Sequence, residues 1–207
     1  MVTIKHLSKQ YGTKTVLHDL NFILEKGKIY GLVGENGAGK TTLFRCMAGF
    51  ETYDGTVSCD YGILKNTLGF LPTDPYFFPK ITGREYLQLL VNARNIATPD
   101  FEATNIFDLP LDEYAETYST GMQKKLGLLG VLLQKNIFFI LDEPFNGVDI
   151  QRNILIKQLI LNLKNAEKTV LLCSQISLNV EKICEQSSTV FSAFFKFKIS
   201  CFIKILR

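Results

Sequence analysis

Residues 28 to 49 read KIYGLVGENGAGKTTLFRCMAG. It runs from a short apolar segment through a glycine-rich turn into a segment with helical character. Within the turn, Gly34, Gly39, Lys40 and Thr41 have the spacing G-x-x-x-x-G-K-[ST]. In this pattern the glycines let backbone N–H groups close around phosphate oxygens, the lysine reaches the β- and γ-phosphates, and the hydroxyl binds Mg²⁺. The pattern would arise by chance in a chain of this length only about 1% of the time, so it predicts a phosphate-binding loop between a strand and a helix.

A second stretch, IFFILDEPFNGVD at 137 to 149, runs from five apolar residues directly into two carboxylates, Asp142 and Glu143. A buried strand of this kind brings Asp142 to the carboxyl edge of a parallel sheet, beside the phosphate loop, where it can hold the metal. Glu143, one residue further, can then reach an attacking water. The alternative is that the two acids merely cap the following helix.

Composition sets the limits of the fold. A chain of 207 residues with 46% hydrophobic content is enough for one domain with a substantial core. Its five cysteines are scattered and form no C-x-x-C, which favours neither a disulfide framework nor a zinc site and indicates a reducing, intracellular compartment. The first residues are too polar for a signal peptide, and no apolar run approaches the ~18 residues of a membrane span. We therefore expect a cytosolic protein or one that is peripheral on a membrane.

The charge distribution argues against a nucleic-acid-binding protein. The chain carries +3 in total, and residues 187 to 207 contribute four basic side chains and no acid, so the remaining body is close to −1. Neutralising nucleic-acid phosphates requires clustered Lys and Arg. We therefore expect no nucleic-acid partner.

Short β-type apolar runs alternate with longer helical ones, which is an α/β pattern. The later strands are continuously apolar, as expected for strands covered on both faces. Helices are predicted to follow residues 39, 82, 120, 150 and 177. The predicted strands are Val2–Leu7, Leu20–Leu24, Lys28–Val33, Gly55–Cys59, Leu68–Leu71, Ile137–Leu141 and Thr169–Cys173.

With these motifs in this order, residues 1 to about 186 resemble the ATP-binding subunits of ABC transporters. The phosphate loop is similar to the family's Walker A and residues 137–143 to its Walker B. YSTGM at 118 to 122 is similar to its LSGGQ signature, and NGVD at 146 to 149 to its D-loop. The resemblance implies nucleotide-binding roles for Tyr11, against adenine, and for Gly34, Glu35, Asn36, Gly37, Ala38, Gly39, Lys40, Thr41 and Thr42.

The resemblance also implies an architecture: a P-loop NTPase of ABC type with a mostly parallel, doubly wound core and N-terminal antiparallel strands. A small helical subdomain is expected at about 76–126, within an ATPase domain of residues 1–186. The segment opens with Tyr76, Phe77 and Phe78, whose aromatic surface favours contact with a membrane partner over an ordinary proline-rich loop.

The signature-like residues Ser119, Thr120 and Gly121 precede an apolar helix, LGLLGVLL. A hydroxyl and free backbone N–H groups at a helix start can hold a terminal phosphate. In ABC proteins that phosphate belongs to ATP on a second subunit. The resemblance therefore implies a dimer, expected to be a homodimer, with two ATP molecules between the chains.

The chain departs from the family at two positions. Thr73 stands where the family has its Q-loop glutamine and, being shorter, is expected to reach metal or water only through an intermediary. Gln175 stands where the family has its switch histidine, and an amide can donate a hydrogen bond to the γ-phosphate but cannot become cationic. The resemblance then implies Glu143 and Gln175 as catalytic residues, and Thr41, Asp142 and Thr73 as metal ligands, with turnover slowed by the two departures.

Residues 187–207, SSTVFSAFFKFKISCFIKILR, form an atypical basic and aromatic tail. Three alternatives remain open for it: a substitute edge strand, a basic amphipathic segment on a membrane or partner, and a non-native ending from a change of reading frame. The abrupt change of composition favours the last.

Taken with the resemblance, the sequence predicts a subunit that binds ATP and Mg²⁺, hydrolyses ATP and powers a separate transmembrane permease of exporter type. It would lie in the cytoplasm, peripheral on the cytoplasmic face of the cell membrane. One alternative is a nucleotide-gated regulatory ABC subunit with little hydrolysis, against which the retained Glu143 argues. Another is a soluble, non-transport ABC ATPase, which would need a second ATPase half or a coiled-coil insertion.

Overall fold

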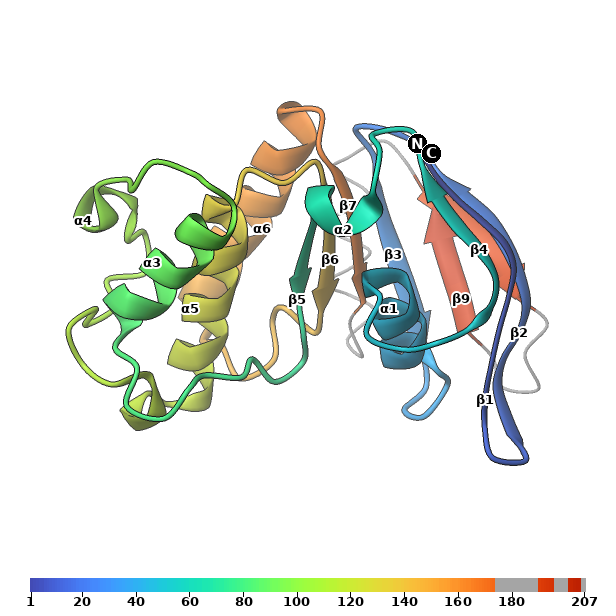
Figure 1. The fold of residues 1–207 in the computed structure, drawn as a ribbon, viewed down its shortest axis with the longest axis horizontal. Coiled ribbons are helices and arrows are strands. Elements are labelled where there is room, and N and C mark those ends of the chain that lie inside the picture. Colours follow the sequence, from blue (N-terminus) through green and yellow to red (C-terminus); the bar gives the residue numbers. More distant parts are fainter. Residues whose placement is uncertain (174–189, 196–200, 206–207) are drawn as a thin grey trace.

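A six-stranded sheet forms the centre of the molecule (Figure 1). The structure, a computed structural model, describes residues 1–173, 190–195 and 201–205. The strand order is β5-β6-β7-β3-β9-β8. Strands β5, β6, β7 and β3 run parallel, whereas β9 pairs antiparallel with both β3 and β8. The strands are β3 (Ile29–Gly34), β5 (Leu68–Leu71), β6 (Phe138–Asp142), β7 (Thr169–Cys173), β8 (Val190–Phe195) and β9 (Cys201–Ile205).

A second, three-stranded antiparallel sheet has the order β2-β1-β4. Its strands are β1 (Val2–Tyr11), β2 (Lys14–Leu24) and β4 (Asp54–Cys59). The first two are longer than predicted because they form one hairpin that turns tightly between Tyr11 and Lys14. The expected N-terminal antiparallel strands are therefore confirmed.

Alternating side chains of the parallel strands divide the core into two layers. Ile29, Phe139 and Leu172 face the helices α5 (Thr120–Leu133) and α6 (Ile150–Asn165). On the other face, Tyr30, Ile140 and Leu171 pack with α1 (Lys40–Ala48) and the small sheet. Every position of β6 and β7 is buried, so the doubly wound α/β class is confirmed.

The remaining helices lie at the opposite end of the molecule from the small sheet (Figure 1). They are α3 (Gly83–Ala93), the single-turn α4 (Phe101–Thr104) and the 3₁₀ helix η1 (Ala115–Thr117); the similarly short α2 (Leu64–Thr67) precedes β5. Helix α3 starts at Thr82, which forms a capping box with Glu85. The short α2 and α4 were not predicted because four residues are too few to show a helical period.

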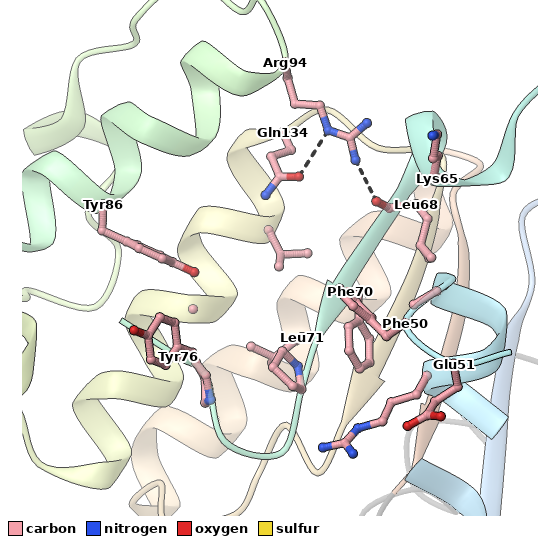
Figure 2. Close-up of a pocket in the computed structure, with 16 residues that line it drawn as sticks. Phe50, Glu51, Lys65, Leu68, Phe70, Leu71, Tyr76, Tyr86, Arg94 and Gln134 are labelled. Atoms are coloured by element: carbon pink, nitrogen blue, oxygen red, sulfur yellow. Dashed lines mark hydrogen bonds between the residues drawn. The ribbon is translucent and has the colours of Figure 1, made fainter. Parts of the chain in front are cut away.

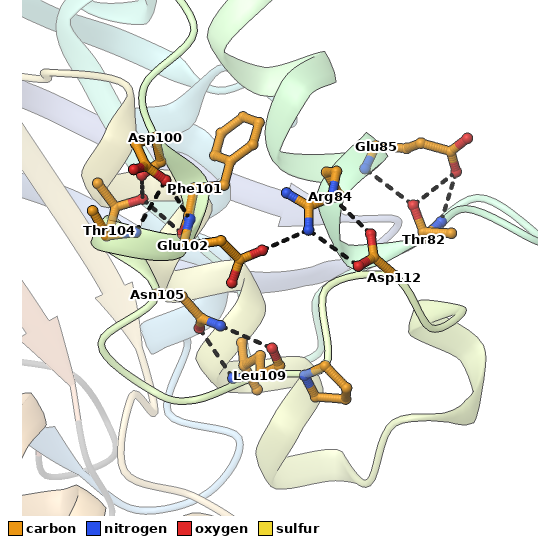
Figure 3. A network of polar contacts seen from close by, with 12 residues as sticks. Thr82, Arg84, Glu85, Asp100, Phe101, Glu102, Thr104, Asn105, Leu109 and Asp112 are labelled. Atoms are coloured by element: carbon orange, nitrogen blue, oxygen red, sulfur yellow. Dashed lines mark hydrogen bonds and ion pairs between the residues drawn. The ribbon is translucent and has the colours of Figure 1, made fainter.

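One arginine ties this helical part together (Figure 3). Arg84 donates from Nε to Asp112 Oδ1 at 2.7 Å and from Nη2 to Glu102 Oε1 at 2.6 Å. It thus connects the start of α3 to α4 and to the loop before η1.

The tail contributes backbone to the central sheet. Strand β9 pairs antiparallel with β3, with Gly31 opposite Lys204 and Gly34 opposite Cys201, and β8 pairs in turn with β9. This pairing is the arrangement of the edge-strand alternative. The helix predicted after residue 177 falls outside the described residues.

The parallel strands bring their carboxyl ends to one edge of the sheet. Leu71 is paired with Leu141, and Asp142 with Cys173. The segments that follow β3, β5 and β6 therefore emerge side by side, as is usual for ligand sites in open α/β sheets. No helix in the described ranges is both long and apolar enough to cross a membrane.

Candidate functional site

The glycine-rich loop after β3 is shaped by two residues in the left-handed region. Gly37 has φ 79 and Gly39 has φ 90. A Cβ on Gly39 would also lie only 3.0 Å from Leu17 Cδ2. Helix α1 starts immediately afterwards with no side-chain cap, and N–H groups at an uncapped helix start can hold an anion.

Lys40 is the buried cation of this loop. Its side chain is 8% exposed, and Nζ donates to the carbonyl oxygens of Gly34 at 2.6 Å and Glu35 at 2.9 Å. The ammonium is thus held within the loop by backbone oxygens. A phosphate oxygen could replace one of these acceptors with a stronger, charge-assisted bond.

Asp142, at the end of β6, joins three segments that are distant in the sequence. Its Oδ2 accepts hydrogen bonds from Thr41 Oγ1 and from Thr73 Oγ1, both at 2.8 Å. Its Oδ1 accepts from Cys173 Sγ at 2.7 Å, and the carboxylate is only 1% exposed. The loop after β5 carries the short Thr73 side chain directly to this carboxylate; that Thr73 reaches a metal or water only through an intermediary stays a prediction.

This donor set fits Mg²⁺. Two hydroxyl oxygens and a carboxylate oxygen lie together, and Mg²⁺ prefers hard oxygen ligands, usually one or two carboxylates together with phosphate oxygens and water. No three His, Cys, Asp or Glu side chains gather as a metal site in the described part of the chain. An ion here would therefore depend on the hydroxyls and on the phosphates of a bound nucleotide.

Glu143 adopts an unusual backbone conformation for a residue with a side chain, with φ 51. Its N–H donates to Cys173 O at 3.2 Å, which fixes the turn directly after the strand. The side chain is 8% exposed, and Oε1 lies 3.9 Å from Cys173 Sγ. Both acids of the Asp-Glu pair therefore lie at the same edge of the sheet.

These groups surround a cavity of about 380 Å³, a size typical of small-ligand sites. Gly34 and Glu35 contribute the carbonyls that hold Lys40. The lining consists of Val16, Asn36, Gly37, Ala38, Gly39, Lys40, Thr41, Thr42, Thr73, Asp142 and Glu143. The structure thus brings together most of the predicted loop residues with all three predicted metal ligands.

One predicted nucleotide-binding residue lies away from this lining. Tyr11, at the end of β1, is 43% exposed and has Lys9 Nζ 4.8 Å from its ring centroid; burial, followed by a hydrogen bond to Glu51, raises its pKa. Gln175 lies outside the described residues.

The signature-like residues also lie apart from the cavity. Ser119 caps α5 by accepting a hydrogen bond from the Met122 N–H at 3.3 Å, and both Ser119 and Thr120 are exposed. Contrary to the prediction, Thr120 and Gly121 are part of the helix and not ahead of it. A Cβ on Gly121 would lie 2.3 Å from Gly147 O, so this end of α5 packs directly on the turn at 146–149.

Sequence reasoning missed two buried polar residues of the site. Cys173 donates to Asp142, and burial raises the pKa of its thiol. Lys124, on α5, is 1% exposed and donates to the carbonyl oxygen of Asp142 at 3.3 Å. The one signal in the sequence was the position of Lys124 two residues before the apolar run of α5.

A second, larger cavity of about 620 Å³ lies between α1, β5 and α5 (Figure 2). Two aromatic side chains at its rim, Phe50 and Tyr76, are 71% and 72% exposed. Arg94 borders one end, donating to Leu68 O at 2.9 Å and to Gln134 Oε1 at 3.3 Å. The cavity is therefore a partly apolar groove on the other side of the loop that carries Thr73.

Comparison with known proteins shows the family of the chain. A protein-family model described as "ABC transporter" matches residues 17–146. The chain is 32% identical over 199 residues to the Bacillus subtilis ABC transporter ATP-binding protein YhaQ, covering 89% of this chain and 66% of that protein. It is 32% identical over 199 residues to the Enterococcus faecalis bacitracin transport ATP-binding protein BcrA, covering 89% and 64%. It is also 32% identical over 185 residues to B. subtilis YthP, an ABC transporter ATP-binding protein, covering 84% and 75%.

Solved structures agree on the fold. One described as the ATP-binding subunit of an ABC transporter superposes with a TM-score of 0.78 at 24% identity, covering 89% of this chain and 83% of that one. A dimeric ATP-binding cassette, MJ0796, bound to ADP and Pi superposes with a TM-score of 0.77 at 17% identity, covering 91% and 92%. The chain spans about two thirds of the length of the first relatives it matches. Family model, relatives and fold together establish that the chain belongs to the ABC transporter family, among its ATP-binding proteins.

Proposed function

We propose that this chain binds Mg-ATP in the 380 Å³ cavity, hydrolyses it and powers a separate membrane permease, in the direction of export. The observation that carries the proposal is the convergence of Lys40, Thr41, Asp142 and Glu143 on one cavity at the carboxyl edge of the sheet. A cation for phosphates, oxygen ligands for Mg²⁺ and a carboxylate for water are the parts that phosphoryl transfer requires.

Each group has a proposed task. The loop N–H groups and Lys40 hold the β- and γ-phosphates, while Thr41, Thr73 and Asp142 supply oxygens for Mg²⁺. Mg²⁺, when bound, neutralises negative charge on the phosphates. Tyr11 is proposed to contact the adenine ring.

Glu143 is proposed as the general base. The attacking water forms a bond to the γ-phosphorus as the bond from that phosphorus to the β,γ-bridging oxygen breaks. Glu143 accepts the proton of the water, and ADP leaves with the bridging oxygen. Gln175, from its position in the sequence, is proposed to donate a hydrogen bond to the γ-phosphate.

The chain is proposed to act as a homodimer. Ser119 and Thr120 are exposed at the start of α5 and away from the cavity of their own chain, which leaves them available to ATP on a second copy. The dimeric form of the structurally similar cassette MJ0796 supports the same arrangement.

The larger groove is proposed to receive the permease. Phe50, Tyr76 and Phe78 are all more than half exposed, and an exposed aromatic cluster beside a groove is typical of a protein contact. Such a contact would hold the subunit on the cytoplasmic face of the membrane. The direction of export rests on relatives named for bacitracin transport and for linearmycin resistance.

Purification of the tagged chain from membranes of its own cells tests the proposal. We expect a permease to co-purify with a preparation that binds and hydrolyses Mg-ATP. Tyr76→Ser should lose the permease and retain hydrolysis, whereas Tyr114→Ser, at another exposed tyrosine (47%), should retain both. Failure of the wild-type chain to bind ATP would contradict the site, and an active chain that brings no permease would contradict the transport role.

A further inference from the structure

Lys124 is a buried cation that the proposed reaction does not use. Its side chain, on α5, is 1% exposed. Nζ donates to three backbone carbonyl oxygens: that of Pro72 at 3.1 Å, that of Thr73, and that of Asp142 at 3.3 Å. An ammonium has three N–H donors, so all three N–H groups of Lys124 bind backbone, two in the loop after β5 and one at the end of β6.

Burying an ammonium is costly unless opposite charge and hydrogen bonds compensate. Burial lowers the pKa of Lys124, while the carboxylates of Asp142, Asp74 and Glu143 act in the opposite direction. The cation therefore lies in a cluster of acids at the edge of the sheet. The three hydrogen bonds to backbone carbonyls are contacts that an apolar residue could not make.

The two segments that Lys124 joins are those whose side chains meet in the site. Pro72 and Thr73 belong to the loop after β5, and Asp142 ends β6. The side chains of the same two residues also contact each other, since Thr73 Oγ1 donates to Asp142 Oδ2 at 2.8 Å. Lys124 thus binds the backbone of two of the proposed Mg²⁺ ligands whose side chains are hydrogen-bonded to each other.

The same loop separates the two cavities. Thr73 lines the smaller one, whereas its neighbours Pro72 and Pro75 line the larger groove. Helix α5 packs closely on this loop, since a Cβ on Gly127 would lie 3.0 Å from Pro75 Cγ. Lys124 and the close packing at Gly127 are therefore both contacts between α5 and this loop.

We infer that Lys124 is a positioning residue, whose ammonium holds the loop at 72–75 against the end of β6 so that Thr73 and Asp142 keep their contact. The expected effect on hydrolysis rests on the proposed function. The claim that Lys124 holds the loop at 72–75 against the end of β6 does not depend on that function. Without the ammonium, the carbonyls of Pro72, Thr73 and Asp142 lose a shared donor. Thr73 then leaves Asp142, and the metal and water are less well placed in the transition state.

Three variants of the full chain test this. Lys124→Met keeps the approximate volume and removes the donors, Lys124→Gln keeps two N–H donors, and Lys125→Met is the matched control at the adjacent, partly exposed lysine. The measurements are kcat, the dissociation constant for ATP, and amide hydrogen exchange at Thr73 and Asp74; Pro72 and Pro75 have no amide hydrogen.

For Lys124→Met we expect kcat to fall at least about 10-fold with less than about a 3-fold change in ATP affinity. Exchange at Thr73 and Asp74 should accelerate. Lys124→Gln should recover part of both losses, and Lys125→Met should match the wild type. This split between kcat and affinity, with rescue by a donor, would not arise from general destabilisation.

The inference is overturned if Lys124→Met has the kcat and the amide exchange of the wild type, or if it loses kcat and ATP affinity equally. It is also overturned if Lys124→Gln has no higher kcat and no slower exchange than Lys124→Met. If Lys124→Met does not fold, the test uses Lys124→Gln, compared with the control Lys125→Met. A lower kcat and faster amide exchange in Lys124→Gln than in Lys125→Met support the inference. Equal values of kcat and exchange in the two variants refute it. A wild-type chain that neither binds nor hydrolyses ATP would instead refute the proposed function. Amide hydrogen exchange at Thr73 and Asp74 would then still test whether Lys124 holds the loop at 72–75.

Discussion

The close packing of Gly121 on the turn at 146–149 leads to a quantitative prediction for Gly121→Ala. A Cβ at this position would lie 2.3 Å from the carbonyl oxygen of Gly147. Carbon and oxygen atoms in close non-bonded contact are ordinarily about 3.3 Å apart, so one backbone segment must move by about 1 Å. The clash is with backbone, and no rotation of a side chain can relieve it.

The net effect on stability follows from two opposing terms. Overpacking of a tight contact costs about 1–3 kcal/mol. Replacing a helical glycine by alanine returns at most about 1 kcal/mol. Because this clash is with backbone, its cost belongs in the upper part of that range, about 2–3 kcal/mol, and subtracting about 1 kcal/mol for the alanine gives a fall of about 1–2 kcal/mol in the free energy of unfolding. This fall lowers the Tm by roughly 2–8 °C in a chain of this size.

Gly130→Ala, on the same helix, is the matched control. Its Cβ would lie 2.5 Å from Leu90 Cδ1 and 3.1 Å from Tyr86 Cε1. These are atoms of side chains, and Leu90 can turn away, so the gain in helix propensity should offset the contact and leave stability within about 1 kcal/mol of wild type. Both variants are compared with wild type by urea unfolding, with equal slopes required. A Gly121→Ala variant at least as stable as Gly130→Ala would refute the argument.

Three further predictions concern the site and the tail. Lys40→Ala should weaken ATP affinity by at least about 10-fold, because a charge-assisted hydrogen bond contributes about 1.5–3 kcal/mol; unchanged affinity in a nucleotide titration would contradict the role of Lys40. Glu143→Gln should retain ATP binding and slow phosphate release by about 10²–10⁴-fold; wild-type release would exclude Glu143 as the base. A chain ending at Gln186 should keep its affinity for ATP, because all residues of the phosphate loop precede the tail. It should lose roughly 2–4 kcal/mol of unfolding free energy, because β3 loses its hydrogen bonds to β9. Loss of affinity in a folded, truncated chain would contradict that prediction, and undiminished stability in urea would show that β9 contributes little.

Features that depend on neighbouring residues along the chain could be predicted from the sequence. The phosphate loop is one, because its glycine spacing, its lysine and its flanking strand and helix all lie within 28–49. Strands β6 and β7 are others, because strands covered on both faces are continuously apolar. The place of Asp142 and Glu143 at the sheet edge followed from the same reasoning, since parallel strands end together.

Contacts between distant segments depend on how the strands and helices pack, which no local pattern in the chain reveals. Thr73 and Asp142 are 69 residues apart, and only the packing of β5 beside β6 makes a threonine long enough to reach the carboxylate. Gly121 faces Gly147 because α5 lies against the turn at 146–149, which a signature-like pentapeptide does not reveal.

Lys124 shows the physical reason most clearly. In the sequence it is one of two adjacent lysines before an apolar run, and an isolated helix would leave both in water. Whether such an ammonium is exposed or buried depends on acceptors that only the assembled sheet provides, here the carbonyls of Pro72, Thr73 and Asp142. The sequence therefore predicts which residues make up most of the site. The hydrogen-bond partners of its buried polar groups depend on long-range packing, because only the folded chain brings donors and acceptors together.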